Sequence, residues 1–272
     1  MNIETNGIHL HAIDTGHGEQ TLVFLHYWGG SARTWQFVTG ALAGSYRTIA
    51  LDQRGWGESD APQQGYTIAD LADDAQGAID ALALARYVLV GHSMGGKVAQ
   101  LLASRRPRGL AGLVLVAPSP PTPMLLPDEA REAMLHAYDT RESIGAVLDH
   151  VLSGSPLAPP RREQVIEDSL RGAPQAKAAW PNAAMREDIS AAVAAIDVPV
   201  LVIAGELDQV DRVETLREQV LPRIAGAQLE VLAGVGHLSP LEAPDALAAA
   251  IRGFVGKLGG DGARTQQAVQ GT

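Results

Sequence analysis

A serine between two glycines is the first candidate for chemistry in this sequence. Residues 91–95 read Gly-His-Ser-Met-Gly, after a short β-branched run and before an Ala- and Leu-rich helical pattern. A strand must therefore reverse into a helix at Ser93, a turn that only minimal side chains at Gly91 and Gly95 allow. The turn exposes the hydroxyl at a helix N-terminus, where the backbone N–H of Met94 can face an oxyanion. Ser93 is therefore the candidate nucleophile.

A serine hydroxyl needs a base within hydrogen-bond reach and an acid that orients this base. Asp208 follows one predicted strand directly, and His237 follows the next strand along the chain. Because parallel strands end at one edge of a sheet, we expect Ser93, Asp208 and His237 to meet there. Two alternatives stay open for the acid, Glu206 and Asp211, and Asp208 itself could instead cap a helix.

Other histidines are expected to have structural roles. His92 precedes the nucleophile, so its side chain should point away from the reaction and pack. His9 and His11 lie two apart on one face of a predicted strand, but no third residue is spaced to complete a metal site. We therefore expect neither a metal nor a cofactor.

An oxyanion needs a second backbone N–H besides that of Met94. The segment His-Tyr-Trp at 26–28 follows a continuous apolar run at 21–25 that is typical of a buried strand. A loop at that strand end is placed to supply the donor, and Trp28 is the candidate.

Strands and helices alternate in the sequence, which predicts right-handed crossovers and a parallel sheet. Residues 67–84 should form a helix with an Asp-rich outer face, and the first two strands should pair as an antiparallel hairpin. The predicted strands cover 8–14, 21–25, 47–51, 87–90, 110–116, 198–204 and 228–231, and the predicted helices include 31–43, 67–84, 95–105 and 243–258.

The pattern changes after the strand at 110–116. Ten of the 16 prolines fall between Pro118 and Pro181 and divide this region into short amphipathic pieces. We interpret 118–188 as a helical cap, 1–117 and 189–258 as the core, and 259–272, which lacks periodicity, as a disordered tail. Apolar cap residues could line a substrate cavity or form the seam with the core; the candidates for substrate contact are Tyr27, Leu125, Tyr138, Leu152, Trp180 and Leu238.

Composition limits the classes of function. A length of 272 residues with 46% hydrophobic residues suits one α/β domain with an insertion. The formal net charge of −10 has no compensating basic run, which argues against a nucleic-acid partner. The chain has no cysteine, no apolar N-terminal leader and no apolar run of membrane-spanning length. We expect a cytoplasmic protein without a membrane partner; the sequence does not indicate an oligomeric state.

These motifs resemble those of the α/β-hydrolase superfamily, in particular its small, cofactor-free serine esterases. The resemblance spans about residues 8–258 and rests on four segments: Gly-His-Ser-Met-Gly-Gly at 91–96, Asp-Gln-Arg-Gly-Trp-Gly-Glu-Ser at 52–59, Gly-Glu-Leu-Asp at 205–208, and Gly-His at 236–237. It implies a mostly parallel eight-stranded sheet flanked by helices, with the cap inserted after the sixth strand. One departure is Tyr27, which stands where this family usually has glycine.

The resemblance implies Ser93 as nucleophile, His237 as base, Asp208 as orienting acid, and Trp28 and Met94 as oxyanion donors. The expected substrate is a small to medium, mostly apolar carboxylic ester or lactone. Alternatives with the same fold are a carbon–carbon bond hydrolase, a perhydrolase of the haloperoxidase-like subgroup, and a small-molecule receptor that retains the triad. Serine at position 93 argues against dehalogenases and epoxide hydrolases, which use aspartate there.

Overall fold

A computed structural model describes residues 1–269 of the chain, with side chains described to residue 258. The strands of this part form one eight-stranded sheet in the order β1-β2-β4-β3-β5-β6-β7-β8. β1 and β2 are antiparallel to their neighbours, and the remaining pairs are parallel. The strands are β1 (Asn2–Thr5), β2 (Ile8–Thr15), β3 (Thr21–Leu25), β4 (Arg47–Leu51), β5 (Tyr87–His92), β6 (Leu110–Val116), β7 (Val200–Gly205) and β8 (Gln228–Leu232).

Helices connect the parallel strands and form the cap. The core helices are α1 (Gln36–Leu42), α2 (Ile68–Ala81), α3 (Met94–Ser104), α9 (Val213–Gln219), α10 (Ser239–Glu242) and α11 (Pro244–Val269). The helices between β6 and β7 are α4 (Asp128–Leu135), α5 (Arg141–Val147), α6 (Pro159–Arg171), α7 (Pro174–Asn182) and α8 (Ser190–Val193). Short 3-10 or π segments are η1 (Ala32–Trp35), η2 (Leu148–Leu152), η3 (Ala184–Arg186) and η4 (Leu221–Arg223).

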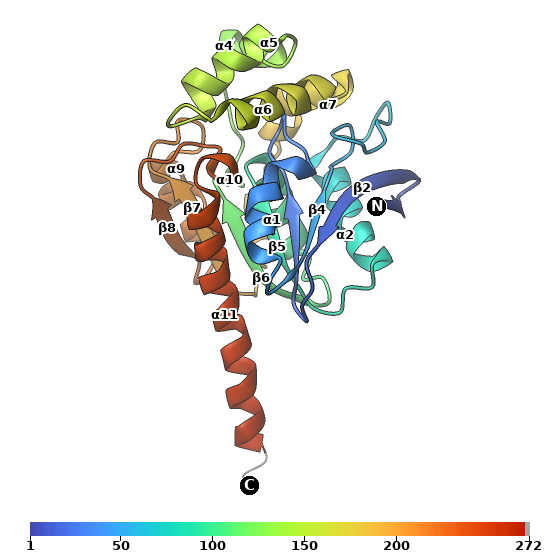
Figure 1. The fold of residues 1–272 in the computed structure, drawn as a ribbon, viewed down its shortest axis with the longest axis vertical. Coiled ribbons are helices and arrows are strands. Elements are labelled where there is room, and N and C mark those ends of the chain that lie inside the picture. The colour runs from blue at the N-terminus through green and yellow to red at the C-terminus, as the bar shows by residue number, and fades with distance from the viewer. Residues whose placement is uncertain (270–272) are drawn as a thin grey trace.

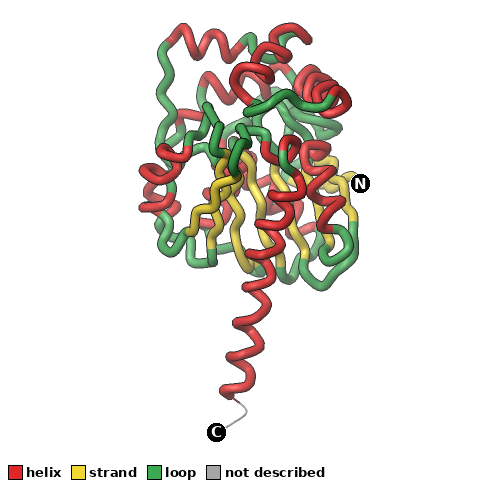
Figure 2. The backbone as a smooth tube through the Cα atoms, turned by 60° about the vertical axis from the view of Figure 1, so that its left-hand side comes forward, coloured by secondary structure: helices red, strands yellow, loops and turns green. Residues whose placement is uncertain are grey.

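The sheet is covered on both faces, which explains the continuous apolar runs of its central strands. Along β3, Leu22 and Phe24 belong to one hydrophobic cluster, whereas Val23 and Leu25 belong to another on the opposite face. Helices α1 and α11 contribute to the first cluster, and α2 and α3 contribute to the second. Figure 2 shows α11 lying over one face of the sheet, roughly along the strands, and continuing past their ends.

The predicted antiparallel hairpin of the first two long strands is wrong. β2 pairs with β1 and β4, and β3 lies between β4 and β5. The burial pattern gives the physical reason. All five residues of β3 are buried, so β3 needs a neighbour on each side, whereas β2 is alternately buried and exposed and suits a position near the sheet edge.

The cap lies over the sheet edge at which the parallel strands end (Figure 1). Its insertion after the sixth strand agrees with the sequence-based fold class, and α4 to α7 all fall within 118–188. At the opposite end, α11 continues past the sheet to Val269 (Figure 1), whereas the sequence predicts a helix end at residue 258. Residues 259–269, which the sequence predicts to be disordered, continue this helix. Residues 270–272 lie outside the described residues, so for them the disordered tail stays a prediction.

The Asp-rich face of α2 is not wholly exposed, contrary to the prediction. Asp74 is 2% exposed and forms an ion pair with Arg54, which is itself buried and also donates to the carbonyl of Gly65. Asn6 donates a further hydrogen bond of 2.9 Å to Asp74. A lone carboxylate would be too costly to bury, so Asp74 turns inward only because the guanidinium of Arg54 is there. This pair anchors the loop at 52–59 to α2.

Replacing Asp74 by alanine should destabilise the fold strongly, because Arg54 would keep its buried charge without a partner. We expect a loss of about 3–5 kcal/mol in the free energy of unfolding, measured by urea denaturation. Asp73→Ala is the matched control: this neighbouring residue pairs with Arg105 at the surface, with its side chain 55% exposed, and should cost at most about 1 kcal/mol. Equal losses in the two variants would contradict this account.

Candidate active site

The backbone at Ser93 is strained at the point where the sequence predicts that the strand reverses into a helix. Its φ of 53° and ψ of −116° lie outside the regions that non-glycine residues usually adopt. A Cβ at Gly91 would collide with the carbonyl oxygen of Gly95, and one at Gly95 would lie 2.6 Å from the carbonyl oxygen of His26. Both glycines are therefore needed where α3 passes close to β5 and to the loop after β3.

The base and acid candidates meet in the interior. Nδ1 of His237 lies 2.9 Å from Oδ2 of Asp208, and both side chains are buried. The other oxygen, Oδ1, accepts hydrogen bonds from the N–H groups of Val210 (2.8 Å) and Asp211 (3.0 Å). With Nδ1–H donating to the carboxylate, Nε2 of His237 is left as the proton acceptor.

The two alternative acids have other partners. Glu206 accepts a 2.8 Å hydrogen bond from the N–H of Gly234. Asp211 is buried and accepts a long hydrogen bond of 3.4 Å from the hydroxyl of Ser119, while its second oxygen has no partner among the described residues. Among the three carboxylates of this loop, Asp208 is therefore the one bonded to His237.

His92 joins the serine turn (residues 91–95) to the histidine loop (residues 233–238). Nε2 of His92 donates to the carbonyl oxygen of His237 at 2.8 Å, and the two rings lie 5.1 Å apart. Burial lowers the pKa of His92 well below its usual value, so this ring stays neutral. The sequence predicts a packing role for His92, and the structure adds the hydrogen bond that fixes the backbone at His237.

Ser93 makes its hydrogen bonds through its backbone. Its N–H donates to Val116 at 3.0 Å, and its carbonyl accepts from Lys97 (3.0 Å) and Ser119 (3.1 Å). Within residues 1–269 no hydrogen bond joins its hydroxyl to His237, so in catalysis Oγ and Nε2 would first have to come together. Catalytic hydrogen bonds often tighten only when substrate binds.

The electrostatics of the pair favour an imidazolium beside a carboxylate. Burial alone would lower the pKa of His237, but the charge and hydrogen bond of Asp208, with contributions from Asp211 and Glu242, raise it above its usual value. Burial likewise opposes the charge on Asp208, yet His237 and the two backbone donors hold its pKa below the usual range. Asp211 behaves differently, since burial raises its pKa to about 7.

Glu242 is a site residue that the sequence analysis missed. Its carboxylate accepts hydrogen bonds from the N–H groups of Gly236 (3.0 Å) and Leu238 (3.1 Å), which flank His237, and from Gly154 of the cap at 2.8 Å. It therefore holds the histidine loop from both sides. No pattern in the sequence marks this glutamate, because its three donors are backbone groups, one of them distant along the chain.

The two candidate oxyanion donors are the backbone N–H groups of Met94 and Trp28. Met94 is the first residue of α3, so its N–H has no partner within the helix. The carbonyl of Tyr27 accepts from Nδ1 of His26 (2.7 Å) and from the N–H of Gly30 (3.0 Å). Because a trans peptide points its C=O and N–H in opposite directions, these bonds turn the N–H of Trp28 away from them.

The tautomer of His26 is set by its partners. Its Nε2 accepts a 3.0 Å hydrogen bond from the N–H of Gln53, so Nδ1 carries the hydrogen that reaches Tyr27. Burial lowers the pKa of His26 and keeps the ring neutral. The loop is thus anchored to the segment after β4.

The side chain of Tyr27, which stands where this family usually has glycine, packs beside His92 and Gly30 and reaches toward α6. Its ring lies 5.2 Å from that of His92 and fills the space beside Gly30, where a Cβ would approach it to 2.6 Å. Its hydroxyl faces Ser169 and Asp168 of α6, and burial raises its pKa well above the usual value.

The predicted substrate-contact residues separate into two groups. Five are buried in the cluster that also contains Met94 and Trp28, whereas Leu125 is 73% exposed and is not part of it. The five are Tyr27, Tyr138, Leu152, Trp180 and Leu238.

The cap closes over this region. Ser93 is 7% exposed and His237 is 2% exposed, so little of either residue is open to solvent. The carbonyl of Leu152 in the cap accepts hydrogen bonds from the N–H groups of His237 (2.8 Å) and Leu238 (3.2 Å). Cap and histidine loop are therefore in direct contact.

The histidines of β2 pair with separate carboxylates. His11 lies 2.8 Å from Asp52, and His9 lies 3.2 Å from Asp60. In the described part of the chain, no group of three or more His, Cys, Asp and Glu side chains is arranged to hold a metal ion. In the same part, no helix has both the length and the apolar character needed to cross a membrane.

Curated relatives match most of this chain at low identity. A hydrolase of 2-hydroxy-6-oxononadienedioate and 2-hydroxy-6-oxononatrienedioate from Escherichia coli is 27% identical over 275 residues, which cover 94% of this chain and 95% of that protein. The dihydrolipoyllysine-residue acetyltransferase component of the acetoin cleaving system from Cupriavidus necator is 27% identical over 252 residues. The match covers 88% of this chain and only 64% of the length of the acetyltransferase.

Solved structures agree in fold over nearly the whole chain. An esterase from Exiguobacterium antarcticum superposes with a TM-score of 0.86 at 25% identity, covering 93% of this chain and 98% of the esterase. An enzyme that degrades N-acyl homoserine lactones gives 0.79 at 30% identity, with coverages of 93% and 100%. The model of the alpha/beta hydrolase family matches residues 22–250, which include the serine turn, the acid loop and the histidine loop. The chain therefore belongs to the alpha/beta hydrolase family.

Proposed function

We propose that this protein is a serine hydrolase that cleaves small to medium, mostly apolar carboxylic esters or lactones through an acyl-enzyme. The observation that carries the proposal is the buried hydrogen bond of 2.9 Å between His237 and Asp208, held against the turn that carries Ser93. Nucleophile, base and acid come from three loops at one edge of the sheet, in the order Ser, Asp, His that is typical of this family.

In the proposed mechanism, Oγ of Ser93 attacks the ester carbonyl carbon while Nε2 of His237 takes the hydroxyl proton. The oxyanion of the tetrahedral intermediate accepts hydrogen bonds from the N–H groups of Trp28 and Met94. The C–O bond of the ester then breaks, and the imidazolium returns its proton to the leaving alcohol. Water, deprotonated by His237, attacks the acyl-enzyme and releases the acid and free Ser93. Asp208 stabilises the imidazolium in both the acylation and the deacylation half of the reaction.

The surroundings of the site favour an uncharged, apolar substrate. The buried candidates for substrate contact are aromatic or aliphatic, and the nearby cations already have partners. Nζ of Lys97 donates to the carbonyls of Thr122 (3.3 Å) and Met185 (3.2 Å), and Arg33 pairs with Glu167 and Asp168. The similarity to an esterase and to a lactone-degrading enzyme supports the same substrate class.

A carbon–carbon bond hydrolase is the second candidate, because one relative is named for a dienedioate substrate. The same three side chains would serve, but a substrate with two carboxylates needs cations free to bind them. Lys97 is already bonded to carbonyl groups, Arg33 already pairs with carboxylates, and the chain has a net charge of −10. These three observations argue against a substrate with two carboxylates. A panel of esters, lactones and dienedioate diketones distinguishes the two candidates.

Replacing Ser93 by alanine should remove ester hydrolysis, since no nucleophile remains to form the acyl-enzyme. We expect turnover of p-nitrophenyl acetate and butyrate to fall by at least about three orders of magnitude. Ser104→Ala is the control, because the hydroxyl of Ser104 bonds within α3 to the carbonyl of Leu101. Equal rates for wild type and Ser93→Ala would exclude the mechanism.

The pH dependence of kcat/KM should follow the deprotonation of His237, because only the neutral imidazole accepts the serine proton. Asp208 raises the pKa of His237 above its usual 6.5, so the rate should reach half its plateau above pH 6.5 and fall about tenfold per unit well below this midpoint. A rate that stays constant from pH 5 to 8 would contradict the assignment.

Removing the carboxylate charge at 208 tests the acid separately. Asp208→Asn should lower the midpoint of the profile, because the imidazolium loses its stabilising charge, and should reduce kcat by up to about four orders of magnitude. Glu206→Gln should leave the midpoint in place, since Glu206 bonds to Gly234 instead of His237. If Glu206→Gln moved the midpoint and Asp208→Asn did not, the acid would be Glu206.

A further inference from the structure

The cap makes three hydrogen bonds to the loop that carries the proposed oxyanion donor. The hydroxyl of Tyr138 donates to the carbonyl of Trp28 at 2.9 Å, and the hydroxyl of Ser169 donates to the carbonyl of Gly29 at 2.9 Å. In the reverse direction, the indole N–H of Trp28 donates to the carbonyl of Lys177 at 3.2 Å. Three separate parts of the cap therefore hold two consecutive residues of the core.

This contact is buried and tightly packed. Tyr138 is 2% exposed, and its ring lies 4.3 Å from the indole of Trp28. Gly29 has a φ of +99°, and a Cβ there would come within 2.5 Å of the ring of Tyr138. The two carbonyls depend on the cap hydroxyls, since an unpaired buried carbonyl is costly.

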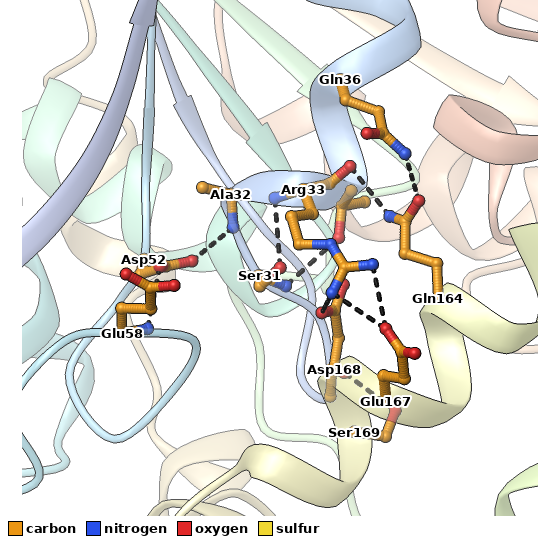
Figure 3. A network of polar contacts seen from close by, with 12 residues as sticks. Ser31, Ala32, Arg33, Gln36, Asp52, Glu58, Gln164, Glu167, Asp168 and Ser169 are labelled. Carbon is orange, nitrogen blue, oxygen red and sulfur yellow. Dashed lines mark hydrogen bonds and ion pairs between the residues drawn. The ribbon is translucent and has the colours of Figure 1, made fainter.

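The same seam continues along the next turn of the chain. Figure 3 shows Arg33 of η1 pointing to Glu167 and Asp168 of α6, with distances of 3.1 and 3.2 Å. In the same view, the side-chain amide of Gln164 donates to the carbonyl of Arg33 at 2.9 Å. Trp28, Gly29 and Arg33 are thus all bonded to the cap.

The N–H of Trp28 belongs to the same planar peptide as the carbonyl of Tyr27, so the groups that bond to this carbonyl set its direction. One of these groups is Nδ1 of His26 in the core, and the other is the N–H of Gly30. The N–H of Gly30 shares its peptide with the carbonyl of Gly29, which Ser169 of the cap holds, and Tyr138 holds the peptide between Trp28 and Gly29. Because Gly29 can adopt many backbone conformations, loss of the cap bonds would free these two peptides to rotate and would release the bond from Gly30 to Tyr27.

We propose that the cap is a structural part of the oxyanion hole, with Tyr138 and Ser169 as positioning residues that hold the N–H of Trp28 toward the reacting carbonyl. This inference rests on the proposed serine hydrolase function. Its consequence is that opening the cap disassembles the hole and closing the cap over the substrate restores it. Hydrolysis is then coupled to a closed cap.

Enzyme kinetics of Tyr138→Phe and Ser169→Ala test the proposal. Each variant keeps the shape of the side chain and loses one hydroxyl, so we expect kcat for p-nitrophenyl butyrate to fall about 10- to 100-fold, with KM within about threefold of wild type. Since both act on one loop, the double variant should lose little more than the worse single variant. If one single variant fails to fold, the other still tests the proposal.

Matched controls remove hydroxyls elsewhere. The hydroxyl of Tyr87, at the start of β5, is buried and has no partner among the described residues, and that of Ser104 lies on α3. Tyr87→Phe and Ser104→Ala should keep wild-type kcat. Unchanged kcat in both cap variants, or a rise in KM with unchanged kcat, would overturn the positioning role and leave Tyr138 as a substrate contact.

Amide hydrogen exchange gives a readout that does not need turnover. Peptides that cover residues 27–31 should exchange at least about tenfold faster in Tyr138→Phe and Ser169→Ala than in wild type and in Tyr87→Phe. Unchanged exchange would overturn the inference whatever the kinetics. Wild type and Ser93→Ala assayed in parallel separate the two proposals: equal rates exclude the hydrolase mechanism, and exchange alone then decides whether the cap holds this loop.

Discussion

The close approach of α3 to the central strands is the constraint on which the candidate site depends. Gly91 and Gly95 have no side chains, so the first turn of the helix can pass beside the carbonyl of His26. The chain must then reverse within one residue, and Ser93 adopts a backbone conformation that costs of the order of 1–3 kcal/mol. The packing of α3 against the central strands of the sheet offsets this cost. The strained serine and the loop after β3 are brought together by the same contact.

Burial determines the chemistry of the second half of the site. In water, a histidine and an aspartate would interact weakly, but His237 and Asp208 are shielded from solvent, and each favours the charged form of the other. Backbone donors satisfy the remaining carboxylate oxygen, so Asp208 can stay ionised. Asp211, three residues away, lacks such a set of donors, and burial raises its pKa to about 7, which shows how strongly local hydrogen bonds decide between neighbouring carboxyls.

The cap contacts the loop of Trp28 and the loop of His237 through backbone groups. Glu242 joins Gly154 of the cap to the residues beside His237, and the carbonyl of Leu152 accepts the N–H of His237. On the other side of the site, Tyr138 holds the carbonyl of Trp28. The insertion therefore shares hydrogen bonds with the loops that carry the candidate base and the proposed oxyanion donor.

Local backbone chemistry made a large part of this protein predictable. The glycine spacing around Ser93 requires a strand–turn–helix, and continuous apolar runs require a covered parallel sheet, so the fold class and the edge where the loops meet follow from the sequence. The positions of Asp208 and His237 directly after strands follow in the same way, because parallel strands end at one edge. The proline-rich segment likewise marks an insertion after β6.

The tertiary structure decided what depends on contacts between distant residues. It placed β3 between β4 and β5, turned Asp74 inward to Arg54 and left Leu125 exposed. It also selected Asp208 over its neighbouring carboxylates as the partner of His237 and revealed the roles of Glu242 and Tyr138. No local sequence pattern predicts these features. The direction of a side chain after a turn and the partners of backbone groups are set only when separate segments pack together.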